Sequence, residues 1–294
     1  MLPRELLKRI RKIEIVTERL VRDRMAGQYH SVFKGRGIAF EEVRPYIPGD
    51  DIRFIDWNVT ARMNEAYVKL FSEEREMTVL LVVDMSASGR FGSRQREKRD
   101  LAAEIAAVLA FSAIRNNDRV GLIIFTDEVE KFVPPKKGKR HVLRVVSEIL
   151  SFSEKSRRTA LDVGLDFLGH VMRRKCVAFL ISDFLAPVAS YERALRITAR
   201  RHDLIPVSVS DPLEEALPDV GFIELCDPET GGIVVFDTGG PEAAAFARAA
   251  RAATEARKAL FKRLAMDPID VRTDRNYLPA LTTFFQARAR RLRH

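Results

Sequence analysis

Three short apolar runs separated by helix-length segments constrain the fold of this 294-residue chain more than any other feature. Residues 78–84, 119–125 and 176–182 are rich in valine, isoleucine and leucine and show little alternation with polar residues. Such runs are typical of strands buried on both faces, as in parallel sheets covered by helices. The sequence therefore predicts an α/β domain with a mostly parallel sheet.

The remaining elements follow from apolar spacing and turn residues. We expect helices at 101–114, 141–150, 160–172 and 191–201, a strand at 204–209, and an edge strand at 128–134 that ends at two prolines. Farther along, we expect a hairpin formed by 222–226 and 233–236, and then an alanine-rich helix at 241–266.

The chain divides into three regions of different composition. We expect a basic amphipathic helix at 1–27, a Gly/Pro-rich lobe at 28–77, and the α/β domain with a C-terminal hairpin and helices at 78–294. Lys and Arg interrupt the first region too often for a signal peptide or a membrane span, and no other segment offers about 18 uninterrupted apolar residues. We therefore expect a cytoplasmic protein without a transmembrane segment.

The cysteines and histidines do not suggest a zinc site. Cys176 and Cys226 lie in apolar runs, far from any second cysteine or histidine at metal-ligand spacing, so we expect both to be buried in a reducing compartment. The five histidines are scattered along the chain.

Positive charge is in excess, with 50 Lys and Arg against 41 Asp and Glu, and much of the excess lies near the two ends. Aromatic residues are not interleaved with these charges, so no surface for stacking bases is indicated and nucleic acid is not expected as a partner. Binding of nucleic acid or of an anionic membrane surface through the basic ends stays open as an alternative.

Polar side chains follow two of the predicted buried strands. Asp84, Ser86 and Ser88 come directly after the first, and Asp183 follows the strand at 176–182, while Thr159 precedes a helix. Since ligands collect at the carboxyl ends of parallel strands, these hard oxygen donors suit Mg²⁺ or Mn²⁺. The alternative is that the two serines cap a turn or the following helix.

The pattern Asp-x-Ser-x-Ser with a distant Thr and Asp resembles the metal-ion-dependent adhesion site of von Willebrand factor A domains. This resemblance implies a Rossmann-like von Willebrand factor A domain, an open, mostly parallel sheet with helices on both faces, here with a small N-terminal hairpin-rich lobe. It also implies a non-catalytic protein that captures an acidic side chain of a partner. Ser86, Ser88 and Thr159 would be direct ligands, and Asp84 and Asp183 would act largely through water.

One departure from that family's pattern lies beside the threonine. Glycines usually precede it and an acidic or amide residue follows it, whereas here Arg157 and Arg158 precede Thr159 and Ala160 follows. The arginines either weaken metal affinity or help to receive an acidic partner.

The N-terminal lobe resembles a second, narrower family. Its stretch at 35–57, GRGIAFEEVRPYIPGDDIRFIDW, with Ala61 and Arg62 after it, is similar to the bacterial family named domain of unknown function 58. That resemblance implies work with a MoxR-type AAA+ ATPase in chaperone-like maturation or stress response of a client protein. The chain has no Gly-x-x-x-x-Gly-Lys-[Ser/Thr] loop, so ATP hydrolysis would come from the partner.

Alternating charges in this lobe allow two interpretations. One is an ion-pair network that holds the lobe against the α/β domain. The other is a docking surface for the ATPase with Trp57 as an aromatic anchor. The candidate partner-binding residues are Arg36, Arg44, Asp50, Arg53, Asp56, Trp57, Arg157 and Arg158.

Enzymatic alternatives have little support. A haloacid-dehalogenase-type phosphatase needs a second acidic residue where Ser86 stands, and neither Gly-x-Ser-x-Gly nor Gly-x-Gly-x-x-Gly follows the first strand. Metal-dependent hydrolysis of a phosphate at the Asp84 site stays open as an alternative.

Overall fold

The computed structural model describes residues 39–72, 76–92, 96–153 and 155–291, together with Arg11 and Ile15. The expected helix at 1–27 and the candidate residue Arg36 lie outside these residues, apart from Arg11 and Ile15, which are helical. Among the described residues, no helix has both the length and the apolar character needed to cross a bilayer.

A six-stranded sheet in the order β10-β7-β6-β3-β4-β5 forms the centre of the α/β domain. All neighbouring strands are parallel except β5, which runs antiparallel to β4. The strands are β3 (Thr78–Asp84), β4 (Arg119–Phe125), β5 (Val129–Lys136), β6 (Val177–Ser182), β7 (Asp203–Ser210) and β10 (Ile269–Arg272).

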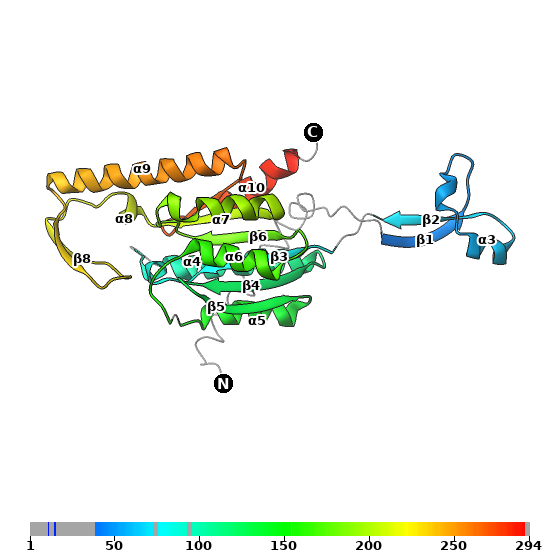
Figure 1. Ribbon diagram of the computed structural model, residues 1–294, viewed down its shortest axis with the longest axis horizontal. Coiled ribbons are helices and arrows are strands. Elements are labelled where there is room, and N and C mark those ends of the chain that lie inside the picture. Colours follow the sequence, from blue (N-terminus) through cyan, green and yellow to red (C-terminus); the bar gives the residue numbers. More distant parts are fainter. Residues whose placement is uncertain are drawn as a thin grey trace.

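Helices cover both faces of this sheet (Figure 1). One face packs against α4 (Lys98–Arg115), α5 (Lys139–Leu150) and α10 (Leu278–Arg291). The other face packs against α6 (Leu161–Val171), α7 (Val188–Arg201) and α9 (Pro241–Arg263). The central strand β3 sends Val79, Leu81 and Val83 into the first layer and Leu80 and Val82 into the second. Its unbroken apolar run is therefore explained by burial on both sides.

Two sequence expectations for the sheet need correction. β5 does not end at the first proline but continues through Pro134 and Pro135 to Lys136. It is an edge strand, where a missing backbone N–H can face away from the sheet. The four-residue strand β10 was not predicted, because so short a segment has too little periodicity to be recognised.

The N-terminal lobe is a separate small unit that stands apart from the six-stranded sheet in Figure 1. Its antiparallel strands β1 (Ala39–Pro45) and β2 (Tyr67–Ser72) flank a 3-10 turn, η2 (Ile52–Phe54), and a short helix, α3 (Trp57–Met63). Its ion pairs Arg44–Asp50, Arg53–Asp51 and Lys69–Asp56 join residues of the lobe to one another. None of these three pairs reaches the α/β domain, as the first of the two interpretations of the alternating charges would require.

A second hairpin lies beyond the carboxyl ends of the parallel strands (Figure 1). It consists of β8 (Phe222–Cys226) and β9 (Ile233–Asp237), and the short helix α8 (Pro212–Glu215) precedes it. The hairpin was predicted, but Cys226 is exposed on it, whereas Cys176 is buried as expected. Cys226 lies on the face of β8 that Phe222 and Glu224 also expose, so its position in an apolar run does not bury it.

Candidate metal centre

Asp84 and Ser182 end two neighbouring parallel strands and face each other. Val83 of β3 pairs with Ile181 of β6, which places the next residues side by side. Ser182 Oγ donates a 2.7 Å hydrogen bond to Asp84 Oδ2, and the backbone N–H of Ser86 donates to Asp84 Oδ1 at 3.0 Å. The Asp84 carboxylate is therefore held in place from both sides.

Ser86 and Ser88 turn their hydroxyl groups toward each other. Their Oγ atoms are 3.1 Å apart, and both residues are buried. Ser86 precedes the short 3-10 helix η3 (Ala87–Arg90), but its side chain makes no capping hydrogen bond there. The interpretation of Ser86 as a helix cap is therefore not supported. Its hydroxyl instead contacts that of Ser88 within the Asp84 loop.

A small cavity of about 20 Å³ lies within this group of side chains. That is room for one ion or water molecule, which needs roughly 10–15 Å³ on this scale. Four of the five predicted ligands, together with Ser182 and Lys98, are among the residues that line it: Asp84, Ser86, Ser88 and Asp183.

Lys98 was not predicted, and it brings a positive charge into the centre. It is the first residue of α4 and is 2% exposed, and its Nζ lies 2.6 Å from Asp183 Oδ2. It also pairs with Glu214 of α8. Burial alone would lower the pKa of Lys98, but the Asp183 and Glu214 carboxylates more than reverse this and raise it, so Lys98 is an ammonium at neutral pH.

The oxygen donors fit a magnesium ion. The carboxylates of Asp84 and Asp183 and the hydroxyls of Ser86, Ser88 and Ser182 line the cavity, and the cationic side chains of Lys98 and Arg99 line it as well. Desolvation, followed by the nearby charge of Asp183, raises the pKa of Asp84 to about 6, which leaves the carboxylate largely ionised at neutral pH. In the described part of the chain no three His, Cys, Asp or Glu side chains converge to hold a metal, so an ion here would depend on the serine hydroxyls.

Thr159, the fifth predicted ligand, does not line the cavity. The backbone N–H of Ala87 donates to the carbonyl of Arg157 at 3.1 Å, which holds the threonine loop against the Asp84 loop. Thr159 Oγ1 donates a 2.6 Å hydrogen bond to Glu229 Oε1, from the turn of the β8–β9 hairpin. Arg157 and Arg158 are exposed beside it.

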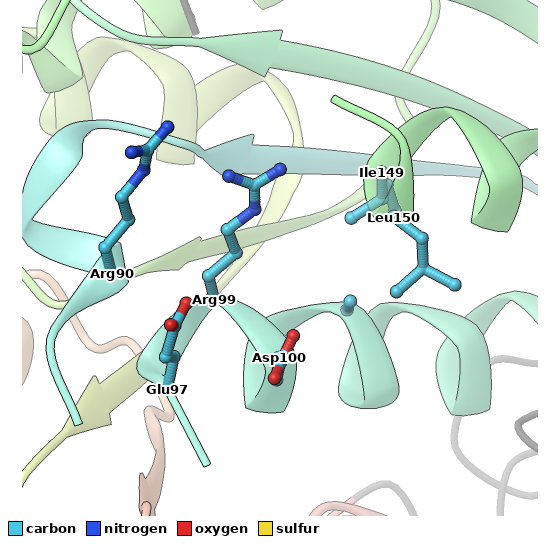
Figure 2. A pocket seen from close by; sticks show the side chains of 7 residues that line it. Arg90, Glu97, Arg99, Asp100, Ile149 and Leu150 are labelled. Carbon is cyan, nitrogen blue, oxygen red and sulfur yellow. The ribbon is translucent and has the colours of Figure 1, made fainter. Parts of the chain in front are cut away.

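A larger cavity of about 340 Å³ adjoins the centre, and Arg99 lines both. Figure 2 shows Arg90 and Arg99 extending in the same direction above Glu97 and Asp100. The lining of this larger cavity thus combines positive and negative side chains with apolar residues of α4 and α5.

The candidate residues of the N-terminal lobe have different environments. Arg44 and Asp50 form a two-pronged ion pair with both contacts at 2.7 Å, Arg53 pairs with Asp51, and Asp56 caps α3. Trp57 is 69% exposed at the start of that helix. The charged residues therefore have structural roles, while the indole is left on the surface. Further large apolar side chains exposed on this lobe are Ile47, Ile52, Phe54 and Met63.

The sheet order and the position of the Asp84 loop define a von Willebrand factor A-type fold with an added N-terminal lobe. The chain belongs to the family described as Protein of unknown function DUF58, whose model matches residues 42–258. The uncharacterized protein Mb1516 of Mycobacterium bovis is 34% identical over 283 residues, covering 96% of this chain and 89% of that protein.

A solved structure shares the fold at low sequence identity, and a second shows a weaker similarity only. An aerotolerance-related membrane protein from Bacteroides fragilis has a TM-score of 0.50 and 15% identity, covering 73% of this chain and 99% of that chain. The SpRpn10 VWA domain has a TM-score of 0.33 and 12% identity, covering 46% of this chain and 75% of that chain.

Proposed function

We propose that this chain is a non-catalytic interaction protein that captures an acidic side chain of a partner or client at a divalent metal site on the Asp84 loop. The observation that carries the proposal is the cavity of about 20 Å³ that Asp84, Ser86, Ser88 and Asp183 line together. Bound magnesium would supply a positive charge with an open coordination position for a carboxylate oxygen.

The chain's own residues prepare that site. Ser182 and the Ser86 backbone orient Asp84, and the pair with Lys98 orients Asp183. The exposed guanidinium groups of Arg157 and Arg158 favour the approach of an acidic segment.

The N-terminal lobe is proposed to dock a MoxR-type AAA+ ATPase, which supplies the ATP hydrolysis. Support comes from the resemblance of residues 35–57 and from the exposed aromatic and aliphatic side chains around Trp57. Large exposed aromatic residues are frequent anchors at protein interfaces. In this arrangement the lobe binds the ATPase while the α/β domain binds the client.

A magnesium titration followed by thermal melting tests the metal site, with Asp84→Ala as the variant. The matched control is Asp127→Ala, because Asp127 also follows a central strand, β4, but does not line the cavity. Ions that bind the native state stabilise it by about 2.7 kcal/mol at a hundredfold excess over Kd. We expect a magnesium-dependent rise in Tm for the parent and for Asp127→Ala, and none for Asp84→Ala. A parent protein that is insensitive to magnesium would refute the metal site.

Docking of the ATPase is tested with a purified MoxR-type ATPase of the same organism. Trp57→Ala should weaken binding at least tenfold without lowering the Tm, because a hot-spot side chain contributes about 2 kcal/mol or more. Ile197→Ala is the control, since Ile197 is 47% exposed on α7 of the other domain. Equal binding by parent and Trp57→Ala would remove this lobe surface from the proposal.

A further inference from the structure

Thr159, the fifth predicted metal ligand, already forms a hydrogen bond with a carboxylate. Thr159 donates its hydroxyl hydrogen bond to Glu229, a residue 70 positions away in the turn of the β8–β9 hairpin. The hairpin thus places an acidic side chain on one of the predicted metal ligands, and the proposed function requires an acidic side chain of a partner at the same centre.

The turn of the hairpin holds Glu229 in a fixed position. Asp227 accepts hydrogen bonds from the backbone N–H of Glu229 at 2.9 Å and from Thr230 Oγ1 at 2.6 Å. Its own N–H donates to the carbonyl of Gly232 at 2.9 Å, and Gly231 has a φ of +74°, which favours glycine. These contacts fix the backbone at Glu229, and the hydrogen bond from Thr159 holds its carboxylate.

The hairpin is held by contacts at its base, but its outer face is exposed to solvent. Buried Thr238 accepts from the N–H of Val220 at 2.9 Å, and the Phe236 ring packs on Phe246 of α9 at 6.2 Å. On the outer face Phe222 is 77% exposed and Val235 is 63% exposed. A strand pair with so little packing opens at a low cost in free energy.

We propose that Glu229 is an internal acidic ligand of the Asp84 centre, so that the β8–β9 hairpin covers the site until the carboxylate of a partner displaces it. This rests on the proposed function, because it assigns Glu229 to the position that the partner's carboxylate takes. The positive charges near that position, Arg157 and Arg158, suit an acidic residue from either source.

Manganese and a spin label on Cys226 test this directly. Cys226 is exposed three residues before Glu229, while Cys176 is buried, so a thiol-reactive label reports on the turn. The variant is Glu229→Gln, which keeps the shape of the side chain and removes its charge. The matched control is Glu224→Gln, because Glu224 is an exposed carboxylate on β8 of the same hairpin.

Three results are expected if Glu229 is an internal ligand. Glu229→Gln increases the mobility of the label. It weakens Mn²⁺ binding about tenfold, which is the lower end of the effect of losing a partner at a metal site. It also adds about one exchangeable water molecule on the bound Mn²⁺, as measured by water proton relaxation. Glu224→Gln matches the parent in all three. A second variant, Thr159→Val, increases label mobility in the absence of metal as well.

The outcomes separate this inference from the proposed function. If Mn²⁺ binds the parent and Glu229→Gln with the same affinity and the same label mobility, the internal ligand is refuted and the metal site stands. If Mn²⁺ binds neither the parent nor either variant, both proposals are refuted. Stronger Mn²⁺ binding by Glu229→Gln would also refute an internal ligand, since it would show that Glu229 opposes the metal.

Discussion

Lys98 and Asp183 form a buried ion pair, with 2.6 Å between Nζ and Oδ2, although 85 residues separate them in the chain. Lys98 begins α4 and Asp183 directly follows β6, so the pair joins a helix to the carboxyl edge of the sheet. The same carboxylate lines the cavity proposed for magnesium. A bound magnesium ion would therefore share the Asp183 carboxylate with the fixed ammonium of Lys98.

Replacing Lys98 with methionine tests whether Lys98 and magnesium neutralise the same carboxylates. Lys98→Met leaves Asp183 and Glu214 without their ammonium and should lower the free energy of unfolding by about 3–5 kcal/mol in the presence of a chelator. Magnesium should restore more stability to this variant than to the parent, because it then neutralises carboxylates that have lost the ammonium of Lys98. Urea unfolding with and without magnesium measures both effects.

The control for this prediction is Lys258→Met, which removes an exposed ion pair with Glu255 on α9 and should change stability by less than about 0.5 kcal/mol. A Lys98→Met protein as stable as the parent in chelator would show that the buried pair contributes nothing net.

The candidate site could be predicted from the sequence where it depends on strand ends. Asp84 and Asp183 each follow an apolar run, and parallel strands bring such residues to one edge. Lys98 could not be found this way, because it stands in the charged stretch 94–99, which resembles a solvent-exposed segment. Glu229 was also missed, since a turn sequence indicates the hairpin but not what its tip contacts.

The fold, too, has parts that could be predicted from the sequence and parts that could not. Long buried strands and amphipathic helices were predicted because burial fixes their composition. The four residues of β10 depend on pairing with β7, a tertiary contact that no local pattern reveals. The charges of the lobe left two interpretations open, because alternating charges indicate pairing without indicating the partner.

Gly164 in α6 should not tolerate alanine. A Cβ there would lie 2.7 Å from the buried Phe125 ring, so Gly164→Ala should lower stability by about 1–3 kcal/mol through overpacking. Gly169→Ala in the same helix meets only a flexible arginine end at 3.4 Å and should be neutral or stabilising by up to about 1 kcal/mol. Chemical denaturation of the two variants makes the comparison. Equal effects would show that α6 moves away from the sheet at no cost.

The two cysteines should differ sharply in reactivity. Burial, followed by the charge of Asp203, raises the pKa of the Cys176 thiol to about 12, whereas Cys226 is exposed. Since the thiolate is the reactive form, a thiol reagent at pH 8 should modify one cysteine in the native protein and two in urea. Mass spectrometry of the labelled peptides identifies them. Rapid labelling of Cys176 in the native state would mean that the start of β6, which Cys176 directly precedes, opens readily.

His202 should make the protein less stable in mild acid. It is 3% exposed, its Nδ1 lies 3.4 Å from Cys176 Sγ, and burial, followed by the charge of Arg201, lowers its pKa below the ordinary 6.5. Above pH 6.5 the ring is neutral in both states. Below it the unfolded chain binds a proton first, so stability falls by up to about 1.4 kcal/mol per pH unit until the folded pKa is reached. Urea unfolding of the parent and of His202→Asn between pH 7.5 and 5 should give a smaller loss in the variant. His170→Asn, which removes an exposed histidine of α6, should follow the parent, and a His202→Asn protein that loses stability as steeply as the parent would place the responsible proton elsewhere.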